Sequence, residues 1–407
     1  SLDLPLESLS LHPFLQSLHK EQWQEVRLGE VAEIFDYQRI PLSTMQRMNR
    51  KGAYPYYGAS GVIDYIDDFI FDGEFVLISE DGENLRTRKT PIAFKVSGKF
   101  WVNNHAHIVK GKKDYFNDLI VYLFENLDLN PYITGAVQPK LNQSTLLNIP
   151  LKIPILETTQ QKIAEILSSF DDKIDLLHRQ NKTLESLALT LFRHYFIDNP
   201  NRNEWELGKL GDLLLETLAG DWGKEQQDDE NGEMVYCIRG TDIADLQNGL
   251  PNKTPIRYVK HKKLMQLQPN NGDIIFEISG GTEMQSTGRC IYINNDIEKL
   301  FDAPILFSNF CRLLRVKKAE YGYFLYLYLK FLYNNDEFFA LENGTSGIKN
   351  LDYKVLLYQH EYTIPNEQQI IRFHKEIEIY YYKINQNKKQ IQNLQAMRDM
   401  LLKAIFA

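Results

Sequence analysis

The chain has 407 residues, a hydrophobic fraction of 43% and a formal net charge of −8 at pH 7. This length suits about two to four domains with buried cores, and no apolar run reaches the roughly 18 residues that span a bilayer. The acidic balance counts against a uniformly basic, nucleic-acid-binding surface, because phosphate contacts depend on Lys and Arg. Basic residues are nevertheless clustered locally, for example at residues 86–89 and 257–263.

Three cysteines, Cys237, Cys290 and Cys311, all lie in the second half of the chain and form no CxxC pair. This pattern indicates neither a disulfide framework nor a zinc site. The first residues also lack the basic and apolar regions of a signal peptide. We therefore expect a soluble, cytoplasmic protein.

The chain is expected to contain five parts. Residues 1–22 form an N-terminal segment with recurring leucines and two prolines, which predicts short helical turns. Residues 23–155 contain short β-rich runs divided by Gly and Asp turns, and residues 199–365 repeat this mixture. We expect a mixed α/β domain in each of these two regions. Residues 156–198 and 366–407 are expected to be helical spacers.

Short sequence anchors occur twice and frame the two domains. Trp23-x4-Leu28-Gly29 returns as Trp205-x4-Leu210-Gly211, near the start of each domain. Ile153-Pro154 followed by Gln160-Gln161 returns as Ile364-Pro365 followed by Gln368-Gln369, at the start of each helix. The sequence between the anchors differs, so we expect a duplicated framework that carries two unlike domains.

Both spacers carry apolar residues at steps of four and three, from Ile163 to Tyr195 and from Phe373 to Ile405. This rhythm predicts an antiparallel coiled coil. Each run holds one asparagine near its middle, Asn181 or Asn387, and the two fall in complementary register positions. A buried Asn pair fixes register at a cost in stability, although each Asn could instead lie on a solvated edge.

Setting Asn181 opposite Asn387 determines every other layer of the coiled coil. Most layers then pair aliphatic residues, such as Ile163 with Ile405, and Phe170 opposite Arg398 is the poor one. Each domain leads directly into its helix through Ile-Pro, so antiparallel helices would place the domains at opposite ends of a rod about 55 Å long. The expected fold class is therefore α+β, with two globular domains joined by two long helices in a pseudo-two-fold repeat.

With these features the chain resembles the specificity subunits of type I restriction-modification enzymes, over nearly its whole length. The resemblance also rests on Tyr54-Pro-Tyr-Tyr57-Gly58-Ala-Ser60-Gly61, on Asp72 to Gly82 and on Trp101-Val-Asn103-Asn104-His105-Ala-His107. The second domain departs from the first, with Ile238-Arg239-Gly240-Thr241 where the first has Tyr-Tyr-Gly-Ala-Ser. The resemblance implies two target-recognition domains that read an asymmetric, bipartite DNA site.

Candidate DNA contacts in the first domain lie on turns and clusters of polar residues. A glycine-rich turn offers Tyr56, Tyr57 and Ser60, although the tyrosines could equally pack inward. The amide of Asn104 suits adenine, and His105 lies beside it. His105 and His107 share a face, but spacing places no third ligand, so no metal is expected. Cationic candidates for phosphate or guanine are Arg86, Arg88, Lys89 and Lys140.

In the second domain the candidate contacts are Arg239, Thr241, Gln285, Arg289 and Lys349. The segments around Lys140 and Lys349 occupy equivalent places before each helix, so we expect them on the same face of the two domains. For any one basic cluster, a solvated surface is the competing interpretation.

Catalytic motifs are incomplete in this sequence. Asn130-Pro131-Tyr132 lacks the second proline of Asn-Pro-Pro-Tyr, which would hold a flipped base, and Asp273-x3-Glu277 lacks the lysine of a nuclease site. We therefore expect a non-catalytic chain without a cofactor of its own. The resemblance implies double-stranded DNA, two methylation subunits and motor-nuclease subunits as partners. The alternative function is a protein-protein scaffold with two β-rich binding domains at a fixed spacing.

Overall fold

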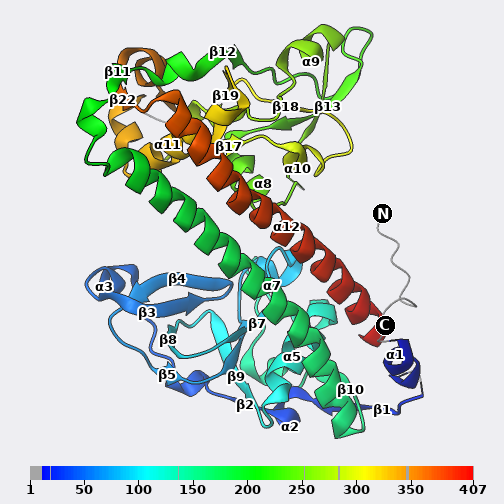
Figure 1. Ribbon diagram of the computed structural model, residues 1–407. Helices are drawn as coiled ribbons and strands as arrows, with labels where there is room; N and C mark the ends of the chain where they lie inside the picture. The colour runs from blue at the N-terminus through cyan, green and yellow to red at the C-terminus, as the bar shows by residue number, and fades with distance from the viewer. Residues whose placement is uncertain are drawn as a thin grey trace. The chain divides into compact units, whose positions relative to one another are not determined.

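The computed structural model describes residues 12–18, 20–135, 137–251, 253–282, 285–344 and 348–406. The chain divides into two compact units, which are Ser1–Asp175 with Asn393–Ala407 (unit 1) and Leu176–Gln392 (unit 2). Each unit holds one β-rich region and part of each long helix (Figure 1). Within the described residues, no helix combines the length and apolarity needed to cross a membrane.

The core of unit 1 is an antiparallel four-stranded sheet that is covered on both faces. Every residue of its strand β6 is buried. Val76 and Ile78 share a core with α5, whereas Phe75 and Leu77 share one with Phe100 of the second sheet. This alternation follows from the two-residue period of a strand. The sheet order is β2 (Ala32–Ile34), β9 (Ala106–Gly111), β6 (Phe75–Ser79), β7 (Ala93–Val96), and α5 spans Tyr115–Asn126.

The second sheet of unit 1 contains a parallel pair, β3 with β8, between two antiparallel neighbours. Its order is β4 (Gly61–Ile66), β3 (Lys51–Gly58), β8 (Lys99–Val102), β5 (Phe71–Asp72). A separate ribbon joins β1 (Trp23–Arg27) to β10 (Pro150–Pro154), with Trp23 opposite Pro154. The two ends of this β-rich region therefore lie side by side.

Unit 2 repeats the order of the four-stranded sheet, and its second sheet repeats β4, β3 and β8 without a counterpart of β5 in the described part of the chain. Its four-stranded sheet is β12 (Leu214–Ala219), β19 (Cys311–Val316), β15 (Ile274–Glu277), β17 (Cys290–Tyr292), and it packs on α11 (Gly322–Asn334). Its second sheet is β14 (Ile256–Val259), β13 (Glu233–Ile238), β18 (Ile305–Phe307), and β13 again pairs in parallel with β18. The two-stranded ribbon that corresponds to β1 and β10 is formed by β11 (Glu206–Gly208) and β22 (Tyr362–Ile364).

A further small sheet in unit 2 has the order β16 (Ser279–Gly280), β21 (Lys349–Leu351), β20 (Glu342–Asn343). Apart from this addition and the absence of a counterpart of β5 among the described residues, the frameworks match, which confirms the predicted α+β class and internal repeat. The repeated tryptophans also have equivalent surroundings. Trp23 contacts Phe406 with ring centroids 6.3 Å apart, and Trp205 contacts Phe196 at 6.2 Å.

The remaining α-helices of the described residues are short. In unit 1 they are α1 (His12–Leu18), α2 (Leu28–Val31), α3 (Thr44–Met48), α4 (Asn84–Thr87) and α6 (Gln143–Leu147). In unit 2 they are α8 (Ile243–Gln247), α9 (His261–Leu267) and α10 (Asn295–Glu298). Part of the predicted N-terminal segment, residues 1–11 and 19, lies outside the described residues; in α1, Leu15 and Leu18 are buried in the core of unit 1.

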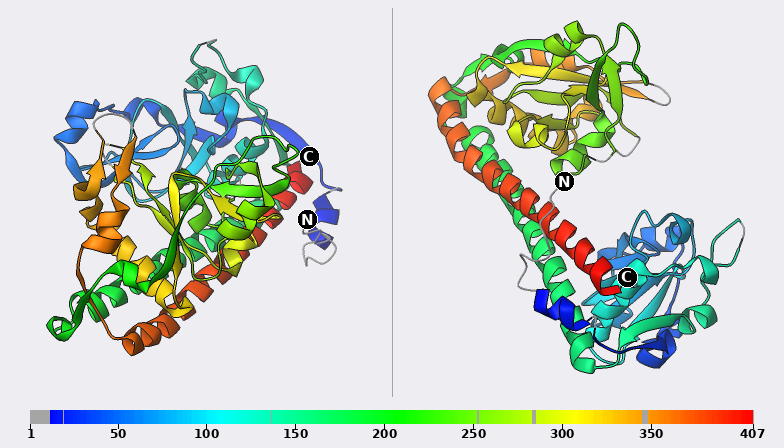
Figure 2. Two further views of the ribbon diagram at one scale, coloured as in Figure 1. Left: turned by 90° about the horizontal axis from the view of Figure 1, so that it is seen from above. Right: turned by 90° about the vertical axis from the view of Figure 1, so that its right-hand side faces the viewer.

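The two long helices are α7 (Glu157–Phe192), which ends in a π-turn over Arg193–Ile197, and α12 (Glu367–Phe406). Within each unit they run side by side (Figure 2). In unit 1, Ile163 and Leu167 share a core with Leu401 and Ile405. In unit 2, Tyr195 contacts the ring of Phe373 with centroids 6.1 Å apart. Both sets of contacts match the antiparallel register expected from the sequence.

The paired asparagines lie together inside unit 2. Nδ2 of Asn387 donates a hydrogen bond of 2.9 Å to Oδ1 of Asn181, and their exposed fractions are 0% and 8%. Nδ2 of Asn387 also lies 3.4 Å from Oε1 of Gln180. A hydrogen bond between two buried amides in an apolar interface penalises any shifted register, because a shift would break that bond, although Oδ1 of Asn387 has no hydrogen-bond partner among the described residues.

In the predicted layer that pairs Phe170 with Arg398, the arginine forms ion pairs with two carboxylates. Arg398 does not depend on the ring of Phe170: its Nη1 donates to Oδ1 of Asp171 at 2.7 Å, and its Nη2 lies 3.3 Å from Oε1 of Glu125. These ion pairs raise the pKa of Arg398 above its ordinary value, against the opposing effect of burial, which is the largest contribution. An arginine at this position is therefore held by neighbouring carboxylates within unit 1.

We predict that Asn181→Leu lowers the free energy of unfolding by about 1–3 kcal/mol, because the amide of Asn387 loses its buried partner. The double variant Asn181→Leu with Asn387→Ile restores or raises stability, since both polar groups are replaced by apolar ones. Urea denaturation of the full chain measures both effects. Asn393→Leu, at an exposed position of α12, is the matched control. A single variant as neutral as this control would contradict a stabilising pair.

Candidate functional site

Three segments of unit 1 converge at the carboxyl end of β6. The turn 58–61 is tied by Ser79, whose Oγ donates to the carbonyl of Ala59 at 2.6 Å. The loop 103–105 is tied by the backbone hydrogen bond from Glu80 N to His105 O, 2.9 Å. The segment 138–142 is tied by the bond from Leu141 N to Glu80 O, 2.8 Å. We call these the converging segments of unit 1.

The converging segments carry four of the predicted contact residues. Ser60, Asn104, His105 and Lys140 are all exposed. The imidazole Nδ1 of His105 lies 2.9 Å from both carboxylate oxygens of Asp81, and Asp81 forms a backbone bridge with Lys140. Residues far apart in sequence thus present amide, imidazole, hydroxyl and ammonium groups at one edge of the sheet.

Unit 2 builds the same junction with equivalent backbone hydrogen bonds. Ile278 N donates to Phe310 O, as Glu80 N does to His105 O, and Leu351 N donates to Ile278 O, as Leu141 N does to Glu80 O. The bond from Ser308 N to Ile238 O corresponds to that from Asn103 N to Tyr57 O. Counting along the chain from these bonds gives the following equivalent pairs: Ser60 with Thr241, Asn104 with Asn309, His105 with Phe310, and Lys140 with Asn350.

These equivalences refine the expectation for Lys349. Lys349 lies one residue before the counterpart of Lys140, on β21, where it pairs with Gly280. Its Nζ lies 3.0 Å from Oε2 of Glu342. Residues 345–347, which precede it in the predicted segment, lie outside the described residues. Both lysines nevertheless belong to the segment whose backbone bonds to the residue just after the central strand, which is Glu80 in unit 1 and Ile278 in unit 2.

A cleft of about 760 Å³ opens among the converging segments of unit 2. Arg239, Thr241, Gln285 and Arg289, all predicted contacts, line it. The other lining residues are Trp222, Gly240, Glu277, Ser279, Gly280, Gly281, Thr282, Asn309, Phe310 and Ile348. Gly240 is required sterically, because a Cβ there would lie 2.1 Å from Oε1 of Glu277.

Sequence reasoning missed Asn309, Phe310 and Asn350. The available signal was weak: Val102-Asn-Asn104-His105 and Phe307-Ser-Asn309-Phe310 share an apolar residue and one asparagine. Only the hydrogen bonds to β6 and β15 establish that the two loops are equivalent.

Two predicted contacts in the first domain have structural roles instead. Tyr56 has 0% exposure, and its hydroxyl accepts a hydrogen bond of 2.9 Å from Leu42 N, so its ring belongs to the core. Arg88 has a left-handed backbone (φ 48°), and its guanidinium donates to the carbonyls of Phe124, Glu125 and Leu127 at the end of α5. A cation at a helix C-terminus satisfies free carbonyls and complements the helix dipole. These two residues are therefore withdrawn as direct contacts.

Other predicted residues have intermediate positions. Tyr57 is half-buried between Phe94 and Phe100, and burial raises the pKa of its phenol. Arg86 and Lys89 are exposed at α4, and Nη2 of Arg86 donates to the carbonyl of Gly135 at 2.8 Å. Within residues 86–89, Arg88 therefore caps a helix, whereas Arg86 and Lys89 are cations at the surface.

The predicted cations of unit 2 are already paired with carboxylates. Arg239 donates to both oxygens of Asp242, at 3.0 and 2.8 Å. Arg289 donates to both oxygens of Glu277, at 2.9 and 2.6 Å, and this pairing raises the pKa of Arg289. Because Asp242 and Glu277 are 2% and 1% exposed, removing either arginine would leave a buried charge without a partner.

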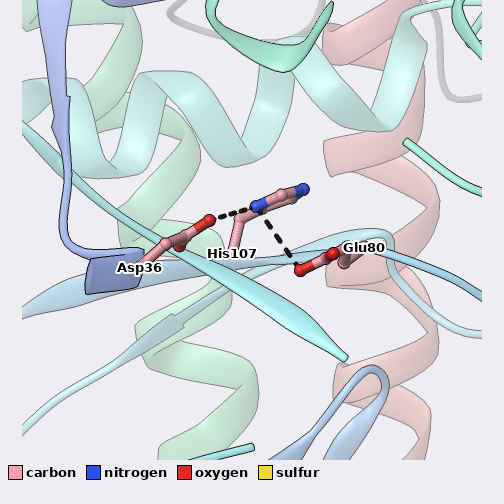
Figure 3. Close-up of side chains that lie close together, drawn as sticks. All are labelled: Asp36, Glu80 and His107. Carbon is pink, nitrogen blue, oxygen red and sulfur yellow. Dashed lines mark hydrogen bonds and ion pairs between the residues drawn. The ribbon is translucent and has the colours of Figure 1, made fainter. Parts of the chain in front are cut away.

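A buried charged network lies directly beneath the converging segments of unit 1 (Figure 3). His107 of β9 is 1% exposed; its Nδ1 lies 2.5 Å from Oδ2 of Asp36, and its Nε2 lies 2.7 Å from the carbonyl of Leu141. Arg39 joins the network through Oε2 of Glu80, at 2.6 Å, and through the carbonyl of Ala106, at 2.9 Å.

Asp36, Glu80 and His107 together offer ligand atoms within 4.8 Å of one another, as a metal site would. However, both ring nitrogens of His107 already face protein oxygens, Oδ2 of Asp36 and the carbonyl of Leu141. Asp36 also accepts a bond from Ile108 N at 2.9 Å. We therefore interpret the group as an ion-pair network that holds the converging segments in place.

Unit 2 has a permanent cation at the corresponding position of its sheet. Arg312 lies opposite Phe276, as His107 lies opposite Ile78. Its Nη1 donates to the carbonyls of Asn309 and Cys311, at 3.1 and 2.8 Å. In both units a basic side chain of the equivalent strand thus contacts backbone carbonyls beside the candidate contact residues, the carbonyl of Leu141 in unit 1 and those of Asn309 and Cys311 in unit 2.

We predict that His107→Leu destabilises the protein by about 3–5 kcal/mol, because the carboxylate of Asp36 loses its buried partner. His105→Leu, at an exposed imidazole, should change stability by no more than about 0.5 kcal/mol. Urea denaturation of the full chain measures both. A chelator should leave the wild-type midpoint unchanged; a marked fall would show that a metal, rather than an ion pair, holds the network.

A family model described as "Type I restriction modification DNA specificity domain" matches residues 20–186 and again residues 202–396. The MjaIX type I restriction enzyme specificity subunit of Methanocaldococcus jannaschii is 28% identical over 358 residues, which cover 79% of this chain and 76% of the relative. The MjaVIII specificity subunit of the same organism is 23% identical over 338 residues, covering 71% and 76%.

A solved structure shows the same fold. The S subunit of a type I restriction-modification system from M. genitalium aligns with a TM-score of 0.56 over 95% of this chain and 96% of that chain. Its sequence identity is 15%, so this likeness concerns the fold alone. The two-fold match of the family model agrees with the two equivalent junctions found in units 1 and 2.

Proposed function

The chain belongs to the type I restriction-modification DNA specificity family, and from this premise we propose that each β-rich region reads one half of a bipartite DNA site. The protein is a DNA specificity subunit. The observation that carries the finer assignment is the pair of equivalent junctions, at which exposed side chains from three segments meet in each unit. Sequence-specific recognition needs several positioned groups that reach base edges together, which such a junction supplies.

The two junctions carry different chemistry, which supports an asymmetric site. Unit 1 presents His105 and Lys140, whereas unit 2 presents Phe310 and Asn350 at the equivalent places. Hydrogen-bond donors and apolar groups select different base edges in the major groove. We accordingly propose Ser60, Asn104, His105 and Lys140 as contacts for one half-site, and Thr241, Gln285, Asn309 and Phe310 for the other.

Arg86, Lys89 and Lys349 are proposed as phosphate contacts around these positions. Tyr57, whose ring is half-buried, is proposed to support the turn that carries Ser60. Arg239 and Arg289 are proposed as positioning residues, because their guanidinium groups are held by Asp242 and Glu277.

We propose that α7 and α12 fix the number of base pairs between the half-sites. A helix rises about 1.5 Å per residue, and B-DNA about 3.4 Å per base pair, so helix length converts directly into spacing. The pair Asn181 and Asn387 would keep this length constant by holding one register. We propose residues 23–155 and 199–365 as the two target-recognition domains.

Chemistry on the DNA is proposed to come from partner subunits. Within the described residues, the acids that resemble half a nuclease site are engaged in ion pairs, Asp273 with Arg315 at 3.2 Å and Glu277 with Arg289 at 2.6 Å. We propose two methylation subunits that use S-adenosylmethionine, and motor-nuclease subunits that use ATP. Ile379 and Tyr382, which are 66% and 63% exposed on α12, are candidates for docking them; Tyr381 is buried and is not.

A cytoplasmic location is proposed because the DNA and these partners would be found there. It agrees with three cysteines that are buried and unpaired. The alternative function, a protein-protein scaffold, would use the same exposed junctions for protein partners. Selection of random DNA duplexes by the chain with its methylation subunits separates the two: a split motif is expected, and a flat distribution would support the scaffold.

We predict that Lys140→Ala weakens binding to the selected DNA by about tenfold and relaxes the motif in the first half-site only. Lys99→Ala is the matched control, because Lys99 is an exposed lysine at the other end of β8 from Asn104. Binding isotherms at fixed salt and repeated selection measure affinity and motif. Equal relaxation of both half-sites would contradict the assignment of one half-site to each unit.

We also predict the effect of lengthening both helices by one heptad, between Leu177 and Asn181 in α7 and between Asn387 and Ile391 in α12. The helical turns added to both helices preserve the pattern of apolar layers and lengthen the pair by about 10 Å. The spacing between the two half-sites should therefore widen by about 3 base pairs. Motif selection reads out the gap, and both half-sites should be unchanged. Lengthening one helix alone breaks the register and serves as the control. An unchanged gap in the doubly extended variant would refute the role of the helices in spacing.

A further inference from the structure

At two equivalent positions of the junctions, unit 2 presents apolar side chains where unit 1 presents polar ones. Phe310, 45% exposed, corresponds to His105. Ile348, 60% exposed, lies three residues before Leu351, as Gln138 lies three residues before Leu141. Large exposed apolar side chains are costly to keep at a surface that is otherwise polar, so their position at the contact edge indicates an apolar feature in the ligand.

Phe310 and Ile348 both line the cleft of about 760 Å³ in unit 2. Trp222 contributes a third apolar side chain, and the guanidinium of Arg257 lies 4.2 Å from its ring centroid. The side chain of Asn309 lies beside Phe310 and adds an amide. Glycines 280 and 281 line part of the cleft without side chains, with φ of +153° and +73°, so a ligand can approach the backbone closely there.

The arginines of the cleft are poorly placed to select guanine. Guanine is usually read by an arginine that offers two donors to O6 and N7. Arg239 and Arg289 each use two donors on a buried carboxylate, Asp242 or Glu277. Redirecting either fork to a base would leave that carboxylate unpaired in the core, which is strongly unfavourable. The groups that remain for discrimination are therefore the apolar side chains, the amides and the hydroxyls, among them that of Thr241.

Among the base edges in the major groove, the C5-methyl of thymine is the apolar group. We infer that unit 2 reads a thymine in its half-site through contact of that methyl with Phe310 and Ile348. The amide of Asn309 is then placed to hydrogen-bond an adjacent base, as amides do with the N6 and N7 of adenine. This inference rests on the proposed function, since it assumes that the cleft faces DNA.

Unit 1 provides the internal contrast. His105, held by Asp81 at 2.9 Å, and Gln138 offer hydrogen-bonding groups at the equivalent positions, and Lys140 adds an ammonium. Contact with a methyl group is therefore not expected to contribute at this junction. The two half-sites should differ in their response to removal of thymine methyl groups.

The experiment uses the full chain with its methylation subunits and duplexes that carry the selected split motif. Each thymine is replaced in turn by deoxyuridine, which keeps base pairing and removes only the methyl. At one position in the half-site of unit 2, affinity should fall about three- to tenfold, as expected for one buried methyl. Replacements in the other half-site, and in the unread gap, should leave affinity unchanged.

Two variants connect the effect to Phe310. Phe310→Ala should reduce the preference for thymine over uracil, because only Ile348 then remains to contact the methyl, whereas Phe310→Leu, which keeps an apolar side chain, should retain the preference. Equal urea midpoints for both variants exclude a folding defect. If Phe310→Ala lowers affinity equally for both duplexes and also reduces DNA bending, the side chain is a wedge between base pairs, and the inference is wrong.

The outcomes also separate this inference from the function on which it rests. Selection that yields no split motif would remove the proposed function itself. A split motif whose half-site for unit 2 contains no thymine, or in which uracil binds as well as thymine at every position, would leave the proposed function intact and overturn the methyl contact.

Discussion

The hydrogen bond between Asn181 and Asn387 is the constraint on which the helical framework depends. Apolar layers alone tolerate a shift by one heptad, because Leu and Ile can pair with many neighbours. Two amides buried at 8% and 0% exposure cannot shift without losing their partner. The same register accounts for the shared core of Ile163 and Ile405 in unit 1 and for the contact of Tyr195 with Phe373 in unit 2. This one polar pair thus holds the two long helices in a single register.

The second organising feature is the end of the central strand in each sheet. Alternating residues of β6 and β15 are buried on both faces, so these strands are rigid supports. Two of the three segments attach to the residue that follows the strand, Glu80 or Ile278, through the same backbone hydrogen bonds in both units. Because these bonds involve only main-chain atoms, the side chains on the segments are free to differ. This separation of support from contact residues explains how one framework carries two unlike surfaces.

The net charge of −8 can be reconciled with a DNA ligand through local pairing. In unit 2, Arg239 and Arg289 are each held by a buried carboxylate. Paired cations contribute little to the non-specific phosphate attraction that a basic surface produces. With the proposed function, recognition by this chain depends on positioned polar and apolar groups more than on bulk charge.

The sequence by itself determined the repeated anchors, the β-rich regions, the two long helices and the pairing of their asparagines. These features are encoded in local periods of two, three and four residues and in short motifs, which can be read along the chain. Tertiary structure alone decided which side chains reach the contact edge. The buried ring of Tyr56, the helix cap formed by Arg88 and the ion pair of Arg289 with Glu277 each depend on partners distant in sequence. The equivalence of His105 and Phe310 likewise rests on cross-strand hydrogen bonds, which two dissimilar stretches of sequence do not reveal.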